Sequence, residues 1–586
     1  MKKILKTVLI ALPFALACLV IYALYYRYTS ANYRLSDYTN DQAVDHINDS
    51  VFSKSKYSYT PKFTDFSDEG KIFYYIKTWG FLKYHSSFND DIDWDEIFLQ
   101  NILKVSQLNF SQFNQLLSQH FALLNPIKEK TIKNKESDYA LIDNTWFDDT
   151  LYLDHANRNN FTYIFQNYKR LRRYGYATRI GKIVFNQEDI YGENCTTEKN
   201  YQLLSLARYW NIINYFYVYK NITDYKWDDV LLMFIPKFYA DNSQKQYKTI
   251  IAQLIEYIDD SHSMMRGDIY DSIFGSNKIP YQLKIINDTA IVSKAIFQDT
   301  SSFQLLKGDI ILAFDTVPIN KKINTTRRFF RKSNPNASNR STAFALVSTF
   351  KQKINVKIMR DNKISQHLIS AYDYNTCRKK SMGGKKKIKQ NSLAVYNSNT
   401  AYLKLYDINN DNEQLFDSAI QYPNVIFDMR GYPHSMGLIK AYEELLPRPV
   451  SFYRGSYANI ACPGMLKYAK ESYNGICNED YYKGNVYILV NEYSQSMSEF
   501  LIMLLQQNPN AITIGSQTAG ADGNVTKIRL PDDLLVLVTG IGIFYPDLSM
   551  CQRVGVKIDH TIYPTTTGIK NNIDEVLKYT LQLINS

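Results

Sequence analysis

A turn crowded with serines, "NEYSQSMSEF" (Asn491 to Phe500), is the first place in this sequence where side chains are spaced for chemistry. It lies between "NVYILV", an apolar run that predicts a buried strand, and "LIMLLQQ", which predicts a helix. Ser496 at the start of that helix is a candidate nucleophile, because a serine hydroxyl beside a base can attack a carbonyl carbon. The same residues fit a capping box, in which Ser496 and Glu499 satisfy free backbone N–H groups. The turn alone leaves both interpretations open.

A histidine at the end of another predicted helix is the candidate base. The segment "YKTIIAQLIEYIDDSHSMMRG" has helical apolar spacing up to Ile258 and then runs into Asp259-Asp260-Ser261-His262-Ser263. Histidine is the side chain whose ordinary pKa suits proton transfer near neutral pH. A histidine at a helix end is also common as a purely structural residue, so His262 needs a partner before it can be called a base.

The elements that must position these residues differ along the chain. "KTWGFLKYHSSFNDDIDWDEIFLQNI" from Lys77 and "RYWNIINYFYVYKNITDYKWDDVLLMFI" from Arg208 echo one another, and each predicts a helical hairpin with tryptophans as packing anchors. Short strands follow from about 279 to 369, centred on "LLKGDIILAFDTVPI". Beyond a basic run, strands alternate with helices, which predicts an α/β domain; "LLVLVTGIGIFYPD" in it has the pattern of a strand pair.

Composition excludes several classes of protein. The 586 residues carry a net charge of +11, but seven Lys or Arg fall in "RKKSMGGKKKIK" (Arg378 to Lys389), a pattern typical of a solvated loop. No nucleic-acid-binding signature accompanies that charge, so no nucleic-acid partner is indicated. Six cysteines are too few for a disulfide scaffold, although Cys462 and Cys477 flank a polar, loop-like stretch and are candidates for a disulfide in an oxidising compartment. The sequence has no CxxC pair and no HExxH motif, so no metal site is indicated.

The N-terminus indicates export. "MKKILK" precedes twenty uncharged residues, Thr7 to Tyr26, which is enough to span a bilayer. A cleaved signal peptide is the alternative, with "ALA" at Ala15 to Ala17 as the cleavage site. We therefore expect a membrane anchor with a periplasmic or extracellular body, or else a secreted protein.

The C-terminal motifs together resemble the serine peptidases that include the C-terminal processing proteases and the tricorn core protease. The resemblance is carried, in order, by "IDDSHS", "LKGDIILAFD", "IFDMRGYP", "NEYSQSMSEF", "GSQTAGADGN" and "YPDLSMCQRVGV". It implies an α/β fold with a crotonase-like (ClpP-like) α/β spiral as catalytic core, a PDZ-like β-rich domain and an α-helical N-terminal region. The expected domains are an anchor or signal (1–30), a region with the first hairpin (31–195), a helical domain carrying Asp-Ser-His (196–275), the PDZ-like domain (276–375), a basic linker (376–392) and the catalytic core (393–586).

The same resemblance implies the site. Ser496 is the expected nucleophile, with Met497 and a residue near Gly431 supplying the N–H groups of the oxyanion hole. Processing proteases use a lysine on the glycine-rich loop as base, but this chain has Ala521 there, and the nearest lysine, Lys527, lies beyond the loop. The tricorn-like arrangement fits better: His262 is then the base, and Ser261 helps to orient the site.

The sequence departs from the tricorn-like pattern at Gln552, where a glutamate is expected. Glutamine can orient a neighbour through hydrogen bonds but cannot balance the charge of a histidinium. The missing charge is expected to cost on the order of 10 to 10³ in rate, by analogy with the orienting residues of catalytic triads. A second departure, "YPHSMG" after Arg430, replaces a more glycine-rich turn near the expected oxyanion donor.

These inferences predict a serine endopeptidase outside the cytoplasm, cutting polypeptides through an acyl-enzyme without a cofactor. Its PDZ-like domain is expected to present the substrate, in the PDZ manner of binding chain ends along a sheet edge. Two rivals stay open: a non-catalytic protein that binds peptide or another ligand on the same scaffold, and a structural role in envelope assembly.

Overall fold

The computed structural model describes residues 63–85, 92–124, 138–140, 142–167, 176–178, 181–185, 188–297, 299, 303–383, 392–460 and 462–586. The expected membrane or signal segment and the centre of the basic run lie outside these residues. Within them, no helix combines the length and apolar character needed to cross a bilayer. In this part of the chain Cys195, Cys377, Cys477 and Cys551 form no disulfide, so the pairing considered for Cys462 with Cys477 is not formed.

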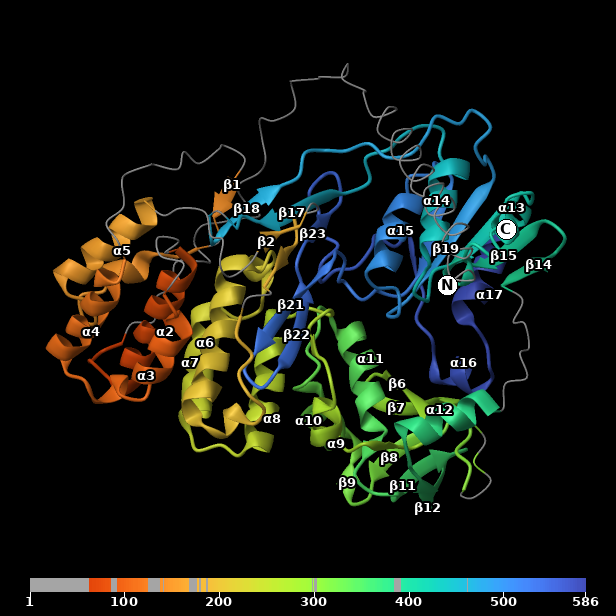
Figure 1. The fold of residues 1–586 in the computed structure, drawn as a ribbon. Coiled ribbons are helices and arrows are strands. Elements are labelled where there is room, and N and C mark those ends of the chain that lie inside the picture. The colour runs from red at the N-terminus through yellow and green to blue at the C-terminus, as the bar shows by residue number, and fades with distance from the viewer. Residues whose placement is uncertain are drawn as a thin grey trace, which may run out of the picture. The chain divides into compact units, whose positions relative to one another are not determined.

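Two helical hairpins of the same design open the described chain (Figure 1). The first is α2 (Asp68–His85) with α3 (Trp94–Asn101), and the second is α6 (Lys199–Phe216) with α7 (Trp227–Tyr239). In each, an indole crosses the hairpin: Trp79 Nε1 donates to Trp94 O at 2.6 Å, and Trp210 Nε1 donates to Trp227 O at 2.8 Å. The two hairpins predicted from the sequence echo, and the role of their tryptophans, are confirmed.

Shorter elements complete the helical region. They are α4 (Phe110–Ala122), α5 (His155–Asn167), α8 (Gln244–Leu254), α9 (Ile269–Phe274), the strands β1 (Asp138–Ala140), β2 (Tyr176–Ala177) and β3 (Ile183–Val184), and the 3₁₀ turns Val105–Gln107, Thr145–Asp148, Cys195–Thr197, Lys220–Ile222 and Ile255–Ile258. The last of these turns continues α8, and Asp259 then takes a left-handed conformation with φ of 49°. The helical path therefore ends at Asp259, directly before the Asp-Ser-His segment.

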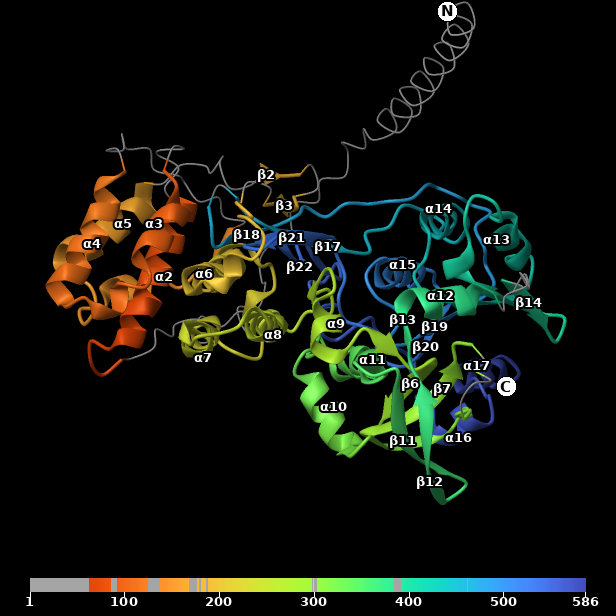
Figure 2. The same cartoon turned by 60° about the horizontal axis from the view of Figure 1, so that its bottom comes forward.

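The next region, 277–373, is built around one antiparallel sheet (Figure 2). Its strand order is β12 (Lys363–Ser370), β11 (Lys353–Arg360), β8 (Ile310–Phe314), β7 (Thr289–Ala295) and β6 (Tyr281–Ile286), with β9 (Val317–Pro318) paired to β8. The helices α10 (Ile319–Arg327) and α11 (Pro335–Leu346) follow β9. A small sheet of β10 (Ser348–Thr349), β5 (Asn277–Lys278) and β13 (Tyr372–Asp373) precedes α12 (Tyr374–Gly383).

The C-terminal part folds around a mostly parallel sheet, as the alternation of strands and helices predicts. The order is β14 (Leu393–Tyr396), β15 (Thr400–Lys404), β16 (Asn424–Asp428), β19 (Asn485–Val490), β20 (Ala511–Gly515) and β24 (His560–Thr561), and only the β14–β15 pair is antiparallel. Its helices are α13 (Gln414–Ala419), α14 (Ser435–Glu444), α15 (Met497–Leu505), α16 (Thr566–Lys570) and α17 (Glu575–Ile584); Leu405–Asp407 forms a 3₁₀ turn. Separate apolar clusters cover the two faces, which explains the continuous apolar runs of β16 and β19.

The strand pair predicted at "LLVLVTGIGIFYPD" is wrong as a pair. Both strands exist, but β22 (Leu534–Thr539) lies in the sheet β21 (Val525–Leu530)–β22–β4 (Met264–Met265). The second, β23 (Gly542–Phe544), joins β1, β18 (Met465–Tyr468) and β17 (Arg454–Ala458). Both edges of β22 are already hydrogen-bonded to β21 and β4, so β23 has no free edge there. This difference matters for the site, because β4 begins two residues after His262.

Candidate active site

The serine turn joins β19 to α15, and its backbone is strained at the candidate nucleophile. Ser496 has φ of 58° and ψ of −123°, a conformation that a residue with a side chain rarely adopts. Its N–H is held by Ala521 O at 2.9 Å and by Glu499 Oε2 at 3.3 Å. Such strain persists only where the surroundings fix it, and it is common at functional sites.

Glu499 fixes the turn against the glycine-rich loop. Its buried carboxylate accepts hydrogen bonds from Thr518 Oγ1 at 2.6 Å, Gly520 N at 2.8 Å and Ala521 N at 2.9 Å, besides the Ser496 N–H. Burial raises the pKa of this carboxyl, while the hydrogen bonds act against the rise. The glutamate that sequence reasoning assigned to helix capping therefore also holds the loop that follows β20.

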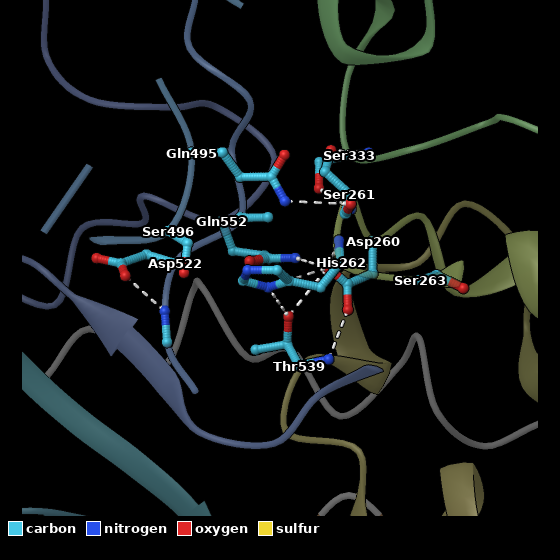
Figure 3. Close-up of polar contacts among 12 residues, drawn as sticks. Asp260, Ser261, His262, Ser263, Ser333, Gln495, Ser496, Asp522, Thr539 and Gln552 are labelled. Atoms are coloured by element: carbon cyan, nitrogen blue, oxygen red, sulfur yellow. Dashed lines mark hydrogen bonds and ion pairs between the residues drawn. The ribbon is translucent and has the colours of Figure 1, made fainter. Parts of the chain in front are cut away.

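His262 is buried and is held by a threonine that the sequence analysis did not single out. Its Nδ1 lies 2.9 Å from Thr539 Oγ1, and that hydroxyl donates to Asp260 Oδ1 at 3.0 Å (Figure 3). Because the Thr539 proton is directed to Asp260, its oxygen accepts the proton of Nδ1. The remaining ring nitrogen, Nε2, then carries the lone pair, which is the tautomer a general base needs.

Sheet register explains why Thr539 meets His262. In the β22–β4 pair, Leu537 lies opposite Met264 and Val536 opposite Met265. Two residues further along this antiparallel register, Thr539 comes opposite His262. The partners are 277 positions apart in sequence, and only this pairing brings them together.

The base segment and the serine turn meet around Ser261. Gln495 Nε2 donates to Ser261 O at 3.3 Å (Figure 3). Ser261 Oγ donates to Ala519 O at 2.9 Å. Ala519 N in turn donates to Ser494 O at 3.0 Å. The fold thus joins the two predicted segments, although among the described residues no hydrogen bond links the His262 and Ser496 side chains themselves. Catalytic contacts often tighten only when substrate binds.

The loop after β16 lies against the same turn. Met429 O accepts hydrogen bonds from Ser494 Oγ and Ser498 Oγ, both at 2.8 Å. Gly431 follows two residues later, and a Cβ there would come within 2.6 Å of the Tyr406 ring. Met497 is the first residue of α15, where backbone N–H groups have no partner within the helix. Both expected oxyanion donors therefore stand on segments that flank Ser496.

Gln552 is buried and binds the carboxylate beside the histidine. Its Nε2 donates to Asp260 Oδ1 at 3.3 Å, while its Oε1 is buried without a partner among the described residues. Asp260 is the aspartate of the quoted Asp-Ser-His motif, but the sequence analysis gave it no role beside His262. Thr539 carries no signal beyond its place at the end of an apolar strand.

The surroundings of His262 favour the neutral form of its ring. Burial lowers the pKa of His262, Asp260 raises it, and the positive charges of Arg340 and Lys332 lower it again. Asp522, next to Ala521, is a buried carboxyl whose pKa is raised well above its usual range by burial and by Glu499. Among the described residues, no group of His, Cys, Asp or Glu side chains is arranged to hold a metal ion.

Comparison with known proteins agrees with this architecture. Residues 399–562 match the model of peptidase family S41. A protein of Chlamydia trachomatis serovar D, described only as "Protein", is 28% identical over 114 residues, which make up 18% of this chain and 19% of that protein. Mature CPAF, solved in complex with lactacystin, is similar over 66% of this chain and 99% of its own, with 13% identity and a TM-score of 0.50. The photosystem II D1 C-terminal processing protease is similar over 63% of this chain and 96% of its own, with 14% identity and a TM-score of 0.37.

The family match indicates a serine-type peptidase core, a hydrolase, within residues 399–562. The resemblance read from the sequence motifs is confirmed by this match between residues 399–562 and the model of peptidase family S41. The matched range contains Ser496, Met497, Gly431 and Gln552. His262 and Ser261 lie outside it, so their assignment depends on the geometry of this chain.

Proposed function

We propose that the protein is a serine endopeptidase that cleaves polypeptides through an acyl-enzyme, with Ser496 as nucleophile and His262 as base. The observation that carries the proposal is the hydrogen bond from His262 Nδ1 to Thr539, which leaves Nε2 unprotonated in a segment bonded to the serine turn. Ser261 acts by tying the base segment to the loop after β20.

The reaction follows from these positions. His262 Nε2 takes the proton from Ser496 Oγ as the oxygen attacks the peptide carbonyl carbon. The N–H groups of Met497 and Gly431 bind the resulting oxyanion, and the N-terminal end of α15 favours the same negative charge. The imidazolium gives its proton to the leaving amine when the C–N bond breaks. Water then hydrolyses the ester, with His262 as base once more.

Substrate and location form part of the proposal. We assign the region 277–373 to a PDZ-like domain that binds polypeptide by its C-terminus and presents it to a crotonase-like core. Its antiparallel sheet and two helices support the first assignment, and the parallel sheet with its strand-to-helix serine turn supports the second. The uncharged segment Thr7 to Tyr26 supports a body outside the cytoplasm, anchored in the membrane or secreted.

A non-catalytic binding protein on this scaffold is the second candidate. It is favoured by Gln552, which stands where the related peptidases carry a charged group, and by the missing bond between His262 and Ser496. The strain at Ser496 and the tautomer of His262 favour catalysis, since neither is needed for binding.

A covalent probe separates the two candidates. The purified full chain is treated with a fluorophosphonate and its intact mass is measured, beside Ser496→Ala, His262→Ala and the control Ser472→Ala, which alters an exposed serine. We expect one adduct on wild type and control, none on Ser496→Ala, and a rate on His262→Ala lower by about 10³ to 10⁴, as for triad histidines. A folded wild-type chain that takes no label would refute the peptidase and favour the binding protein.

A further inference from the structure

Asp260, the aspartate of the Asp-Ser-His motif, receives an unusual number of hydrogen bonds for a residue to which the family resemblance assigned no part in the site. Thr539 donates to it twice, from N at 2.7 Å and from Oγ1 at 3.0 Å. The backbone N–H of His262 donates at 3.0 Å, and Gln552 Nε2 donates at 3.3 Å (Figure 3). The side chain of Asp260 is fully buried, so the structure holds a carboxylate in place with four donors and with the base beside it.

The path from this carboxylate to the imidazole runs through one hydroxyl. Asp260 Oδ1 and His262 Nδ1 are 4.0 Å apart, which is too long for a good hydrogen bond. Thr539 Oγ1 bridges them, at 3.0 Å from the carboxylate and 2.9 Å from the ring. The hydroxyl has one proton and gives it to Asp260, so its orientation is fixed and only Nδ1–H can pair with its lone pair.

Gln552 completes this arrangement because it is neutral. Its amide nitrogen faces Asp260 at 3.3 Å. A glutamate in the same place would put a second carboxylate against a buried one, and two such groups cannot both be ionised at neutral pH. The position that resembles the family's charged residue has therefore become a donor to the carboxylate that replaces it.

We propose that Asp260, acting through Thr539, is the positioning pair for the base, and that it supplies the negative charge that Gln552 cannot. This inference rests on the proposed function of His262. No bond is made or broken at either residue: Thr539 keeps its proton, Asp260 takes none up, and the pair holds the ring and stabilises the imidazolium during proton transfer. Lys332 and Arg340 are the opposing charges near the ring, and Lys332 is itself paired with Glu256 at 2.6 Å.

Thr539→Val is the sharpest test, because it removes the hydroxyl and keeps the shape and the backbone N–H that binds Asp260. Thr539→Ser restores the hydroxyl and is the matched control. We expect the rate of fluorophosphonate labelling of Ser496 to fall by about 10 to 10³ in Thr539→Val, in the range of triad orienting residues. Thr539→Ser should stay within a few-fold of wild type. A Thr539→Val chain that labels at the wild-type rate would overturn the inference.

Gln552→Glu is a second test, because the inference and its alternative predict opposite changes in the labelling rate. If Asp260 already supplies the charge, the added carboxyl disturbs it and the labelling rate falls several-fold. If position 552 simply lacks its charge, the rate rises. An unchanged or higher rate would therefore overturn the inference.

A measurement that does not depend on enzymatic activity separates this inference from the proposed function. Nitrogen NMR of the His262 ring, assigned with His262→Gln, reports which ring nitrogen carries the proton. We expect Nδ1–H in wild type and Thr539→Ser, and a mixture of tautomers in Thr539→Val. A wild-type chain that shows Nδ1–H but takes no label refutes the peptidase and retains the positioning pair; a ring whose tautomer ignores Thr539 refutes the pair even if Ser496 is labelled.

Discussion

A buried cluster of four charges fixes the first helical hairpin to the second, and its disruption makes a quantitative prediction. Lys83 Nζ lies 2.7 Å from Asp95 and 2.6 Å from Glu188, and Arg208 lies 2.6 Å from Asp95 and 3.0 Å from Glu188. The four side chains are at most 4% exposed. Burial alone raises the pKa of Asp95, but Lys83 and Arg208 outweigh it and lower that pKa. The cluster is neutral as two cations and two anions.

Lys83→Met removes one cation and keeps the length of the side chain. Asp95 and Glu188 then share only Arg208, which leaves one uncompensated negative charge in the interior. Breaking a buried ion pair from one side costs about 3–5 kcal/mol, because the remaining charge has lost its solvent and its partner. We expect a loss of that size in the free energy of opening α2 against α6.

Native-state hydrogen exchange of the α2 and α6 amides measures this free energy directly. Lys104→Met is the control, since Lys104 is exposed and has no charged partner among the described residues. Adding Glu188→Gln to Lys83→Met restores neutrality and should recover part of the loss. If Lys83→Met changes protection no more than Lys104→Met, the cluster does not hold the hairpins together and this reasoning is wrong.

Two further predictions concern the site. Burial lowers the pKa of His262 below its ordinary 6.5, so the reactive neutral ring persists to lower pH. The rate of Ser496 labelling should therefore drop with an apparent pKa below 6.5 as the pH is lowered. An apparent pKa at or above 6.5 would contradict the assigned environment of His262. Arg340 on α11 donates to Glu492 O at 2.5 Å and Gln495 Oε1 at 2.7 Å. Hydrogen bonds from a charged donor contribute about 1.5–3 kcal/mol, so Arg340→Met should slow the labelling of Ser496 about tenfold or more. Arg328→Met alters an exposed residue and should leave the labelling rate unchanged. Equal rates in the two variants would show that Arg340 does not hold the serine turn.

Local pattern was sufficient for the elements and for the two segments of the site. The apolar period of α8 and the run before Ser496 indicated a helix end and a strand-to-helix turn, and both are present. The repeated tryptophan pattern predicted two hairpins, because in each hairpin one tryptophan donates an indole hydrogen bond to the backbone of the other.

The local sequence pattern did not predict which distant strands pair with one another. "LLVLVTGIGIFYPD" has the apolar pattern of two strands, but pattern does not state which edge each strand meets, and β22 pairs with β4 rather than with β23. Thr539 is a small polar residue at a strand end, a kind of position with many uses. Its role appears only when the register places it opposite His262.

The same sheet connects the helical hairpins to the chemistry. Arg208, from the buried charge cluster on α6, also donates to Arg529 O at 3.2 Å, and Arg529 lies on β21. In β21, Arg529 pairs with Leu535 of β22, the strand that ends at Thr539. The hairpins therefore support the strand that orients the base, and a variant that loosens the cluster should weaken the Thr539–His262 bond as well as the fold. If Lys83→Met opens α2 but leaves the His262 tautomer unchanged, the hairpins stabilise the chain without positioning its base.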